Sequence, residues 1–305
     1  MARSLKEYAL ISLRGIAMGA ADVVPGVSGG TIAFITGIYE ELLETISGFN
    51  LGLVKTLREE GVKTAWQKAN LNFLIALIGG IFLAVISLSH LISYLLENHT
   101  EMLWAFFFGL VLASVFFVGR QVKEWGISRT ISFIIGTGIA VFVTSLPPMA
   151  GSDSTLFLFV SGAIAICAMI LPGISGSFIL LILGSYTVVI NAIKSFEISK
   201  IAVFLGGCVI GLLSFSHLLN WMYKKHHDIT VSLLTGFLLG SLQKLWPWQN
   251  KEELLHTHSD GKEDWIMNNV MPNTFEGDPQ ILGVTLCFGV GFILIFALER
   301  IAKKA

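Results

Sequence analysis

The chain has 305 residues, of which 54% are hydrophobic and only 13% are charged, with a formal net charge of −1. A typical soluble domain carries about 25% charged residues. Here apolar stretches of about 17–25 residues, long enough for a bilayer core, recur along the whole length. The composition excludes a soluble globular protein and predicts a polytopic membrane protein, with no nucleic-acid partner expected.

The first predicted element is an apolar hairpin over about residues 8–47 that is interrupted near its middle. Proline and glycine break helices, and each arm is shorter than the roughly 20 residues of a full crossing. Three predicted spans follow, at about 71–96, 101–119 and 130–146. The candidate site residues of the interruption, called here the first motif, are Pro25, Gly26, Ser28, Gly29, Gly30 and Thr31.

The second half of the chain repeats this order of elements. An interrupted hairpin is predicted over about residues 155–194, followed by spans at about 201–222, 229–245 and 279–299. An acidic segment, residues 247–278, separates the last two spans and has no role that the sequence reveals. The candidate site residues of this second motif are Pro172, Gly173, Ser175, Gly176 and Ser177.

An internal repeat is predicted to relate residues 1–150 to residues 151–305. The two motifs align in register, and Ser89-His90-Leu91 aligns with Ser216-His217-Leu218. Glycine matches alone are weak evidence because membrane helices are rich in glycine, but the Ser-His-Leu match is harder to dismiss. Paired interruptions in two repeats point to the binding site of a transporter.

Loop charge decides whether each hairpin returns to its own side or forms one interrupted span. Short cytoplasmic loops collect Lys and Arg, and these residues flank the first hairpin on both sides, as Arg3, Lys6, Lys55, Arg58 and Lys63. The hairpins are therefore predicted to be re-entrant. Because a re-entrant hairpin plus three spans makes an odd number of crossings, the second half is expected to be inverted. The predicted fold class is an all-α polytopic membrane protein with an inverted repeat and cytoplasmic termini.

Facing hairpin tips of this kind offer an anion site. Helices that begin near Ser28–Thr31 and near Ser175–Ser177 would leave free N–H groups and positive dipole ends at the breaks. Such ends suit a phosphate or a carboxylate. The alternative is that glycine and serine only allow close packing of the re-entrant helices.

Five further residues are candidates because a charged or titratable group inside a membrane is costly and often functional. Asp22 is interpreted either as a proton-coupling carboxylate or as a cap of the broken helix. Arg14 and Arg120 either contact an anion or snorkel to the interface. His90 and His217 occupy matching positions and are interpreted either as a titrating pair or as histidines that hydrogen-bond across helices.

The run Ala-Asp-Val-Val-Pro-Gly-Val-Ser-Gly-Gly-Thr at 21–31, with Leu-Pro-Gly-Ile-Ser-Gly-Ser at 171–177, resembles the PopT family of polyprenyl-phosphate transporters. The resemblance covers essentially the whole chain. It implies a multi-pass protein of the cytoplasmic membrane of a prokaryote, a bacterium or archaeon. The implied activity is that of a flippase that returns undecaprenyl phosphate from the outer to the inner leaflet of that membrane, for reuse in cell-wall biogenesis. The implied partners are the polyprenyl phosphate lipid and the bilayer, and protons or another coupling ion and a homo-oligomer stay open.

Two other functions compete with lipid transport. An ion-coupled carrier of a small carboxylate would use the same anion-binding tips. A polyprenyl-pyrophosphate phosphatase would need a nucleophile or base near a basic cluster, and neither motif has an adjacent His or Glu. We therefore expect a transporter and no enzyme, with no cofactor and no metal.

Overall fold

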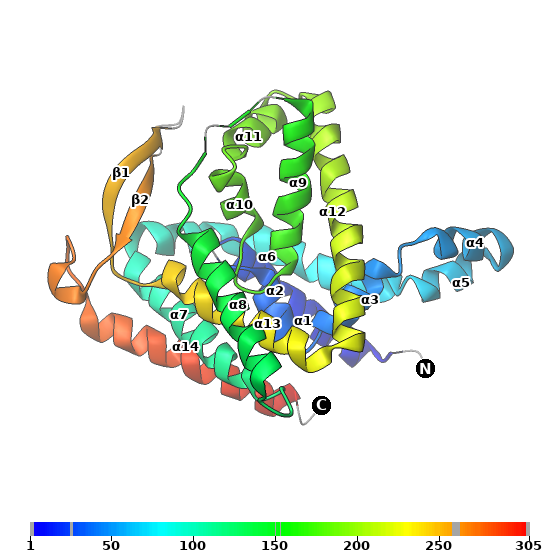
Figure 1. Cartoon of the computed structure of the whole chain (residues 1–305), viewed down its shortest axis with the longest axis horizontal. Helices are drawn as coiled ribbons and strands as arrows, with labels where there is room; N and C mark the ends of the chain where they lie inside the picture. The colour runs from blue at the N-terminus through cyan, green and yellow to red at the C-terminus, as the bar shows by residue number, and fades with distance from the viewer. Residues whose placement is uncertain (1–2, 25–26, 150, 153, 258–262, 303–305) are drawn as a thin grey trace.

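The computed structural model describes residues 3–24, 27–149, 151–152, 154–257 and 263–302. The chain is mostly helical, and a single two-stranded antiparallel β-hairpin is found in the described part (Figure 1). Two helical hairpins with a break near their tips meet at the centre of the molecule, and long apolar helices surround them.

The first hairpin consists of α1 (Leu5–Asp22), α2 (Gly29–Ile35) and α3 (Tyr39–Ser47). A capping box starts α1, in which Ser4 and Glu7 satisfy each other's backbone amides. Gly37 has a φ of +74°, a conformation that glycine adopts without strain, and it turns the chain from α2 into α3. The interruption predicted from the first motif is confirmed, because α2 begins at Gly29.

Two short helices and three long ones complete the first half. The short pair, α4 and α5, projects from the body at the right of Figure 1. The long helices α6, α7 and α8 follow close to the predicted ranges. The bounds are α4 Leu51–Glu59, α5 Gly61–Lys68, α6 Leu71–Asn98, α7 Thr100–Gly119 and α8 Ile127–Thr144.

The second hairpin consists of α9 (Thr155–Ile170), α10 (Gly176–Ile182) and α11 (Tyr186–Lys194), with a bend of 108° between α10 and α11. Gly184, at φ +65°, makes this turn as Gly37 does in the first hairpin. The remaining elements are α12 Ile198–Lys225, α13 His227–Ser241, η1 Leu242–Leu245, β1 Gln249–Thr257, β2 Glu263–Asn269, η2 Pro272–Thr274 and α14 Ile281–Ala302.

Large apolar side chains point outward from the long helices. Among the described residues, α6, α7, α8 and α12 are long and apolar enough to cross a bilayer, and the bent α10–α11 pair passes the same test as one unit. Such faces are unfavourable in water and suit lipid. Exposed examples include Phe82, Ile86, Ile134, Phe142, Val209, Ile210, Leu286 and Ile293. The prediction of a polytopic membrane protein is confirmed at this level.

Close helix pairs are built around glycines that touch a carbonyl of the partner helix. In the α1–α6 pair, a Cβ on Gly15 would overlap the carbonyl of Leu77, and one on Gly80 would overlap that of Ser12. The α9–α12 pair has the same arrangement, with Gly162 against Phe204 and Gly207 against Phe159. Small residues let membrane helices approach closely, so these four positions set the spacing of both pairs.

The other two tight pairs each join a helix of one half to a helix of the other. Helix α7 packs on α14, where Gly109 faces Phe288 and Gly291 faces Phe106. Helix α13 packs on α8 in the same way, with a Cβ on Gly236 set to overlap the carbonyl of Phe133 and one on Gly136 that of Leu233. The two halves therefore interlock through their second and third long helices.

Three features differ from the sequence-based expectation. The acidic segment 247–278 contains the β1–β2 hairpin, which an all-helical fold does not include. The long connection after the first hairpin forms α4 and α5, which the charge pattern did not reveal. Helix α13 has 15 residues, fewer than the predicted span over 229–245, because the 3-10 turn η1 takes over its last residues.

Two adjacent glycines of α6 provide a matched test of this packing. Gly80→Ala should force α1 away from α6, whereas a Cβ on Gly79 meets nothing within 4 Å. We expect Gly80→Ala to lower the thermal unfolding midpoint of the purified protein. Gly79→Ala should leave it unchanged or raise it, since alanine favours a helix over glycine by about 1 kcal/mol. Equal midpoints for the two variants would contradict the contact.

Candidate functional site

The two broken hairpins touch each other directly at their tips. The Thr31 hydroxyl oxygen accepts a hydrogen bond from the backbone amide of Gly173 at 2.8 Å. The Ser28 hydroxyl donates to the carbonyl oxygens of Met169 and Leu171, each at 3.3 Å. Ser28 and Thr31 are each only 1% exposed. Side chains of the first hairpin therefore satisfy backbone groups that the break leaves open in the second hairpin.

The amides of the first motif are largely occupied within the chain. The Asp22 carboxylate accepts from the amide of Gly29 at 2.6 Å, and the Ser28 hydroxyl accepts from the amide of Gly30 at 3.1 Å. Asp22 thus caps the broken helix, which is one of its two predicted roles. Pro25 and Gly26 lie outside the described residues.

The second motif keeps more of its donors open. Helix α10 begins at Gly176, as predicted, and Ser175 at its N-cap makes no side-chain cap hydrogen bond. Instead the hydroxyls of Ser175 and Ser177 bond each other at 2.8 Å, and Ser177 is exposed while Pro172 is buried. The two motifs are therefore unequal: the first is closed by Asp22, and the second presents hydroxyls.

Gly173 is held at φ +88° against α13. A Cβ there would lie 2.7 Å from the hydroxyl oxygen of Ser241 and 3.0 Å from the carbonyl oxygen of Phe237. The tip of the second hairpin thus needs glycine both for its backbone conformation and for this close approach. Helix α13 forms the wall behind the tip, which the sequence did not indicate.

Lys244 is a candidate that sequence reasoning missed. It lies in η1, directly after α13, and its Nζ stands 4.9 Å from the ring centroid of Phe178. Phe178 follows Ser177 in α10, so this half-buried cation lies beside the second motif. No sequence pattern indicated this contact, because Lys244 and Phe178 are far apart in the chain and only the fold brings η1 to α10.

Two predicted arginines are not joined to the tips by a hydrogen bond or ion pair among the described residues. Arg14 is half-buried in the middle of α1. Arg120 is exposed at the C-cap of α7, next to Gly119, whose neighbours are Thr235 and Trp125. The predicted contact of either arginine with an anion therefore has no support in this arrangement.

The two matched histidines lie on outer faces of their helices. His90 in α6 and His217 in α12 are both exposed, and the His217 Nδ1 lies 2.6 Å from the carbonyl oxygen of Leu213 in its own helix. In the part of the chain that the structure describes, no hydrogen bond or ring contact joins the two. The one bond, made by His217, stays within its own helix and does not join two helices.

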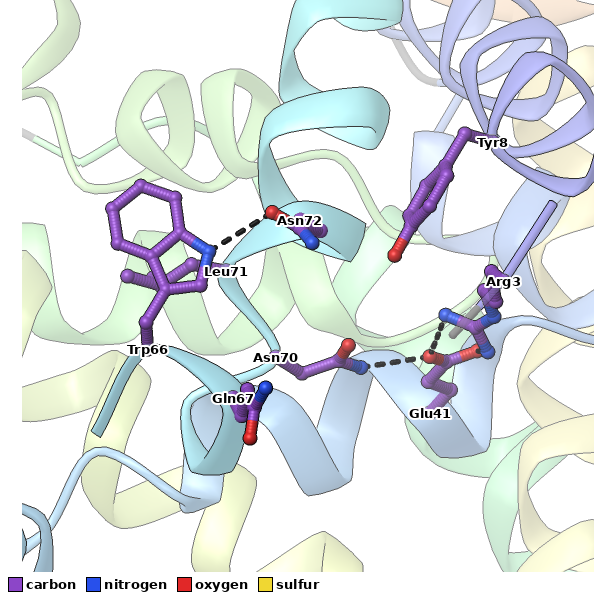
Figure 2. Close-up of a pocket in the computed structure, with 8 residues that line it drawn as sticks. All are labelled: Arg3, Tyr8, Glu41, Trp66, Gln67, Asn70, Leu71 and Asn72. Atoms are coloured by element: carbon purple, nitrogen blue, oxygen red, sulfur yellow. Dashed lines mark hydrogen bonds and ion pairs between the residues drawn. The ribbon is translucent and has the colours of Figure 1, made fainter. Parts of the chain in front are cut away.

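A polar pocket of about 540 Å³ lies where α1, α3, α5 and α6 meet (Figure 2). In it Arg3 and Asn70 converge on the Glu41 carboxylate, with hydrogen bonds of 2.8 and 2.7 Å. The hydrogen bond to Glu41 raises the pKa of the Arg3 guanidinium. These contacts join the start of α1, helix α3 and the start of α6. Because Glu41 already pairs with the Arg3 cation, the pocket offers little free positive charge.

The fold and the touching tips define a class: a multi-pass membrane protein with two interrupted helical hairpins that meet inside it. No group of three or more His, Cys, Asp or Glu side chains that could hold a metal occurs among the described residues. A family model described as undecaprenyl phosphate translocase-like matches residues 18–263. The chain belongs to this family.

Two curated relatives are similar to the chain. A polyprenyl-phosphate transporter of Vibrio cholerae serotype O1 is 45% identical over 309 aligned residues, which cover 100% of both proteins. A polyprenyl-phosphate transporter of Staphylococcus aureus is 35% identical over 254 residues, covering 77% of this chain and 85% of the relative. No solved structure matches the chain.

The contact between the tips can be tested with an isosteric substitution. Thr31→Val removes the acceptor of the buried Gly173 amide, and an unpaired buried donor costs about 1–3 kcal/mol. Thr36→Val is the control, because the Thr36 hydroxyl bonds only to carbonyls of its own helix. We expect Thr31→Val alone to lower the thermal unfolding midpoint, and equal effects would argue against the inter-hairpin bond.

Proposed function

We propose that this protein carries polyprenyl phosphate across the cytoplasmic membrane, from the outer to the inner leaflet, with the phosphate passing the two hairpin tips. Membership of the undecaprenyl phosphate translocase-like family supports the substrate. The observation that carries the route is the direct contact between Thr31 and Gly173, because it joins the two breaks at one place. No covalent step is required, which fits a transporter and no enzyme.

The proposed architecture is an inverted repeat with the bounds given above. Equivalent glycines support it, since Gly15 and Gly80 in the α1–α6 pair have counterparts in Gly162 and Gly207 of the α9–α12 pair. Helix α14 of the second half packs on α7 of the first, and α8 of the first half packs on α13 of the second, which fits the same symmetry. Two halves of this kind can rock against each other about the tips.

The proposed orientation places both termini in the cytoplasm. In Figure 1 the N-terminal end and the α4–α5 pair lie at the right and the C-terminal end lies at the bottom, whereas the β1–β2 hairpin lies at the left. The basic residues Lys55, Arg58 and Lys63 belong to α4–α5. An excess of Lys and Arg marks cytoplasmic loops, so β1–β2 is assigned to the outer face.

The phosphate is proposed to enter beside the second motif. A phosphomonoester carries about −1.5 to −2 charges at neutral pH and cannot cross hydrocarbon unaided. Lys244 and the hydroxyls of Ser175 and Ser177 supply a cation and short donors on one side of the tip. The polyprenyl tail stays in the lipid, against the apolar outer faces of the long helices.

Asp22 is proposed to control access to the first motif. Its carboxylate already occupies the Gly29 amide that a phosphate would take, so the two anions compete for one donor. A proton on Asp22 would remove the negative charge that repels the phosphate, which couples phosphate passage to protonation. The capping geometry and the coupling role are in this way two aspects of one contact.

Reconstituted vesicles test the transport. Lipid phosphate exposed on the outer leaflet is measured with a phosphate-binding reagent, with and without the protein. In Lys244→Gln the exposed lipid phosphate should disappear from the outer leaflet about ten times more slowly, because a hydrogen bond to a charged group contributes about 1.5–3 kcal/mol. Lys251→Gln is the matched control, since that lysine stands over the Trp265 ring in the β-hairpin. Unchanged exposure with the wild-type protein would overturn the proposed function.

Asp22→Asn separates coupling from capping in the same vesicles. Asparagine keeps an oxygen acceptor for the Gly29 amide and removes the charge. We expect the variant to unfold near the wild-type temperature and its transport to lose its response to an imposed pH gradient. A wild-type response in Asp22→Asn would limit Asp22 to capping.

Cysteine labelling tests the orientation. In a background in which Cys167, Cys208 and Cys287 are replaced by alanine, an impermeant maleimide should label Lys251→Cys in intact cells. It should label Lys63→Cys only after permeabilisation, because both positions are exposed but lie on the two proposed sides. The reverse pattern would contradict the proposed topology.

A further inference from the structure

A basic pocket lies between two helix turns, away from the hairpin tips. It has a volume of about 420 Å³ and is formed by the α7–α8 and α12–α13 turns. Its lining residues are Lys123, Arg129, Lys225, His226, His227, Asp228 and Ile229. Both turns belong to the side assigned to the cytoplasm, since they follow the inward-running helices α7 and α12.

The charge in this pocket is unbalanced. Lys123, Arg129 and Lys225 are basic, and the single carboxylate, Asp228, lies 3.1 Å from the His227 ring nitrogen. The buried Nε of Arg129 has no hydrogen-bond partner. Positive charge therefore exceeds negative charge in a cavity that also holds an unused buried donor.

Two further features of the α12–α13 turn favour an anion. Helix α13 starts at His227 without a side-chain cap, so its first amides lie at the turn that lines the pocket without a side-chain acceptor from the N-cap. Lys225 rests over the ring of Trp221, with its Nζ 5.5 Å from the centroid, which keeps the lysine close to the pocket mouth. The cation is held by the ring and stays free of a carboxylate among the described residues.

We propose that this pocket binds a terminal phosphate group at the cytoplasmic membrane surface, as the place where a translocated head group arrives. The proposal rests on the proposed lipid transport for its ligand, and on the pocket alone for its chemistry. Three cations against one carboxylate match a phosphomonoester of about −1.5 to −2 charges. A phosphodiester lipid carries one charge and should bind less tightly.

Trp221 gives a local readout of this pocket. The purified full-length protein is titrated in detergent with farnesyl monophosphate and, separately, with inorganic phosphate and phosphatidylglycerol. Tryptophan emission is followed, and Trp221→Phe defines the part of the signal that comes from Trp221. We expect a saturable change with a phosphomonoester, because phosphate draws Lys225 away from the ring.

Substitutions then assign the signal to the pocket. Arg129→Gln should raise the midpoint of the titration about tenfold, the effect of losing one charge-assisted hydrogen bond. Lys225→Gln should abolish the Trp221 signal, because it removes the cation that stands over the ring. Lys63→Gln removes one exposed charge outside the pocket and should leave the midpoint unchanged. Arg129→Lys keeps the charge and should restore part of the affinity, which a merely unfolded Gln variant could not explain.

The outcomes separate this pocket from the transport proposal. A tighter midpoint for farnesyl monophosphate than for inorganic phosphate identifies a lipid head group, and equal midpoints identify free phosphate as the ligand. A wild-type midpoint in Arg129→Gln, an unchanged Trp221 signal in Lys225→Gln, or no saturable change with any phosphomonoester would each overturn the pocket even if vesicle transport is normal. If vesicle transport fails but the Arg129-dependent signal persists, the transport proposal fails and the pocket stands.

Discussion

The contact between the two broken hairpins is the constraint on which the rest of the molecule depends. A helix that stops among apolar side chains exposes backbone donors and acceptors, and each unpaired group is costly where water is absent. Here the Thr31 hydroxyl takes the amide of Gly173, and the Ser28 hydroxyl meets the carbonyls of Met169 and Leu171. The second break is not satisfied by its own hairpin alone, so the hairpins must be packed together.

That requirement explains the close helix packing around the tips. The arms α1 and α9 are pressed onto α6 and α12 by glycines at carbonyl contact, which fixes how deep each tip can reach. Ion pairing reinforces the first hairpin from its open end, where Lys224 of α12 bonds Glu44 of α3 at 2.7 Å. Large apolar side chains on the outer faces suit the surrounding lipid, and small residues between the helices let the backbones approach closely.

The charges are arranged unevenly along the proposed route. Asp22 closes the first motif, Lys244 stands beside the second, and three cations line the pocket at the α7–α8 and α12–α13 turns. A phosphate attracted by a cation at each end would meet a carboxylate at the centre. Such an order allows binding on either side while the middle stays closed to passive ion flow, which suits a carrier better than a channel.

The sequence by itself determined the long apolar helices, the two helix breaks and the residues that make them, because proline, glycine and hydropathy act locally. Through its resemblance to a known family it also indicated the substrate. Only the tertiary structure decided which groups meet: that Thr31 bonds Gly173, that Asp22 caps Gly29, and that Lys244 reaches Phe178. The tertiary structure also shows that His90 and His217 lie on outer faces of their helices and that Arg14 and Arg120 make no hydrogen bond or ion pair with the tips among the described residues. The sequence could not determine this, because side-chain direction depends on how helices rotate when they pack.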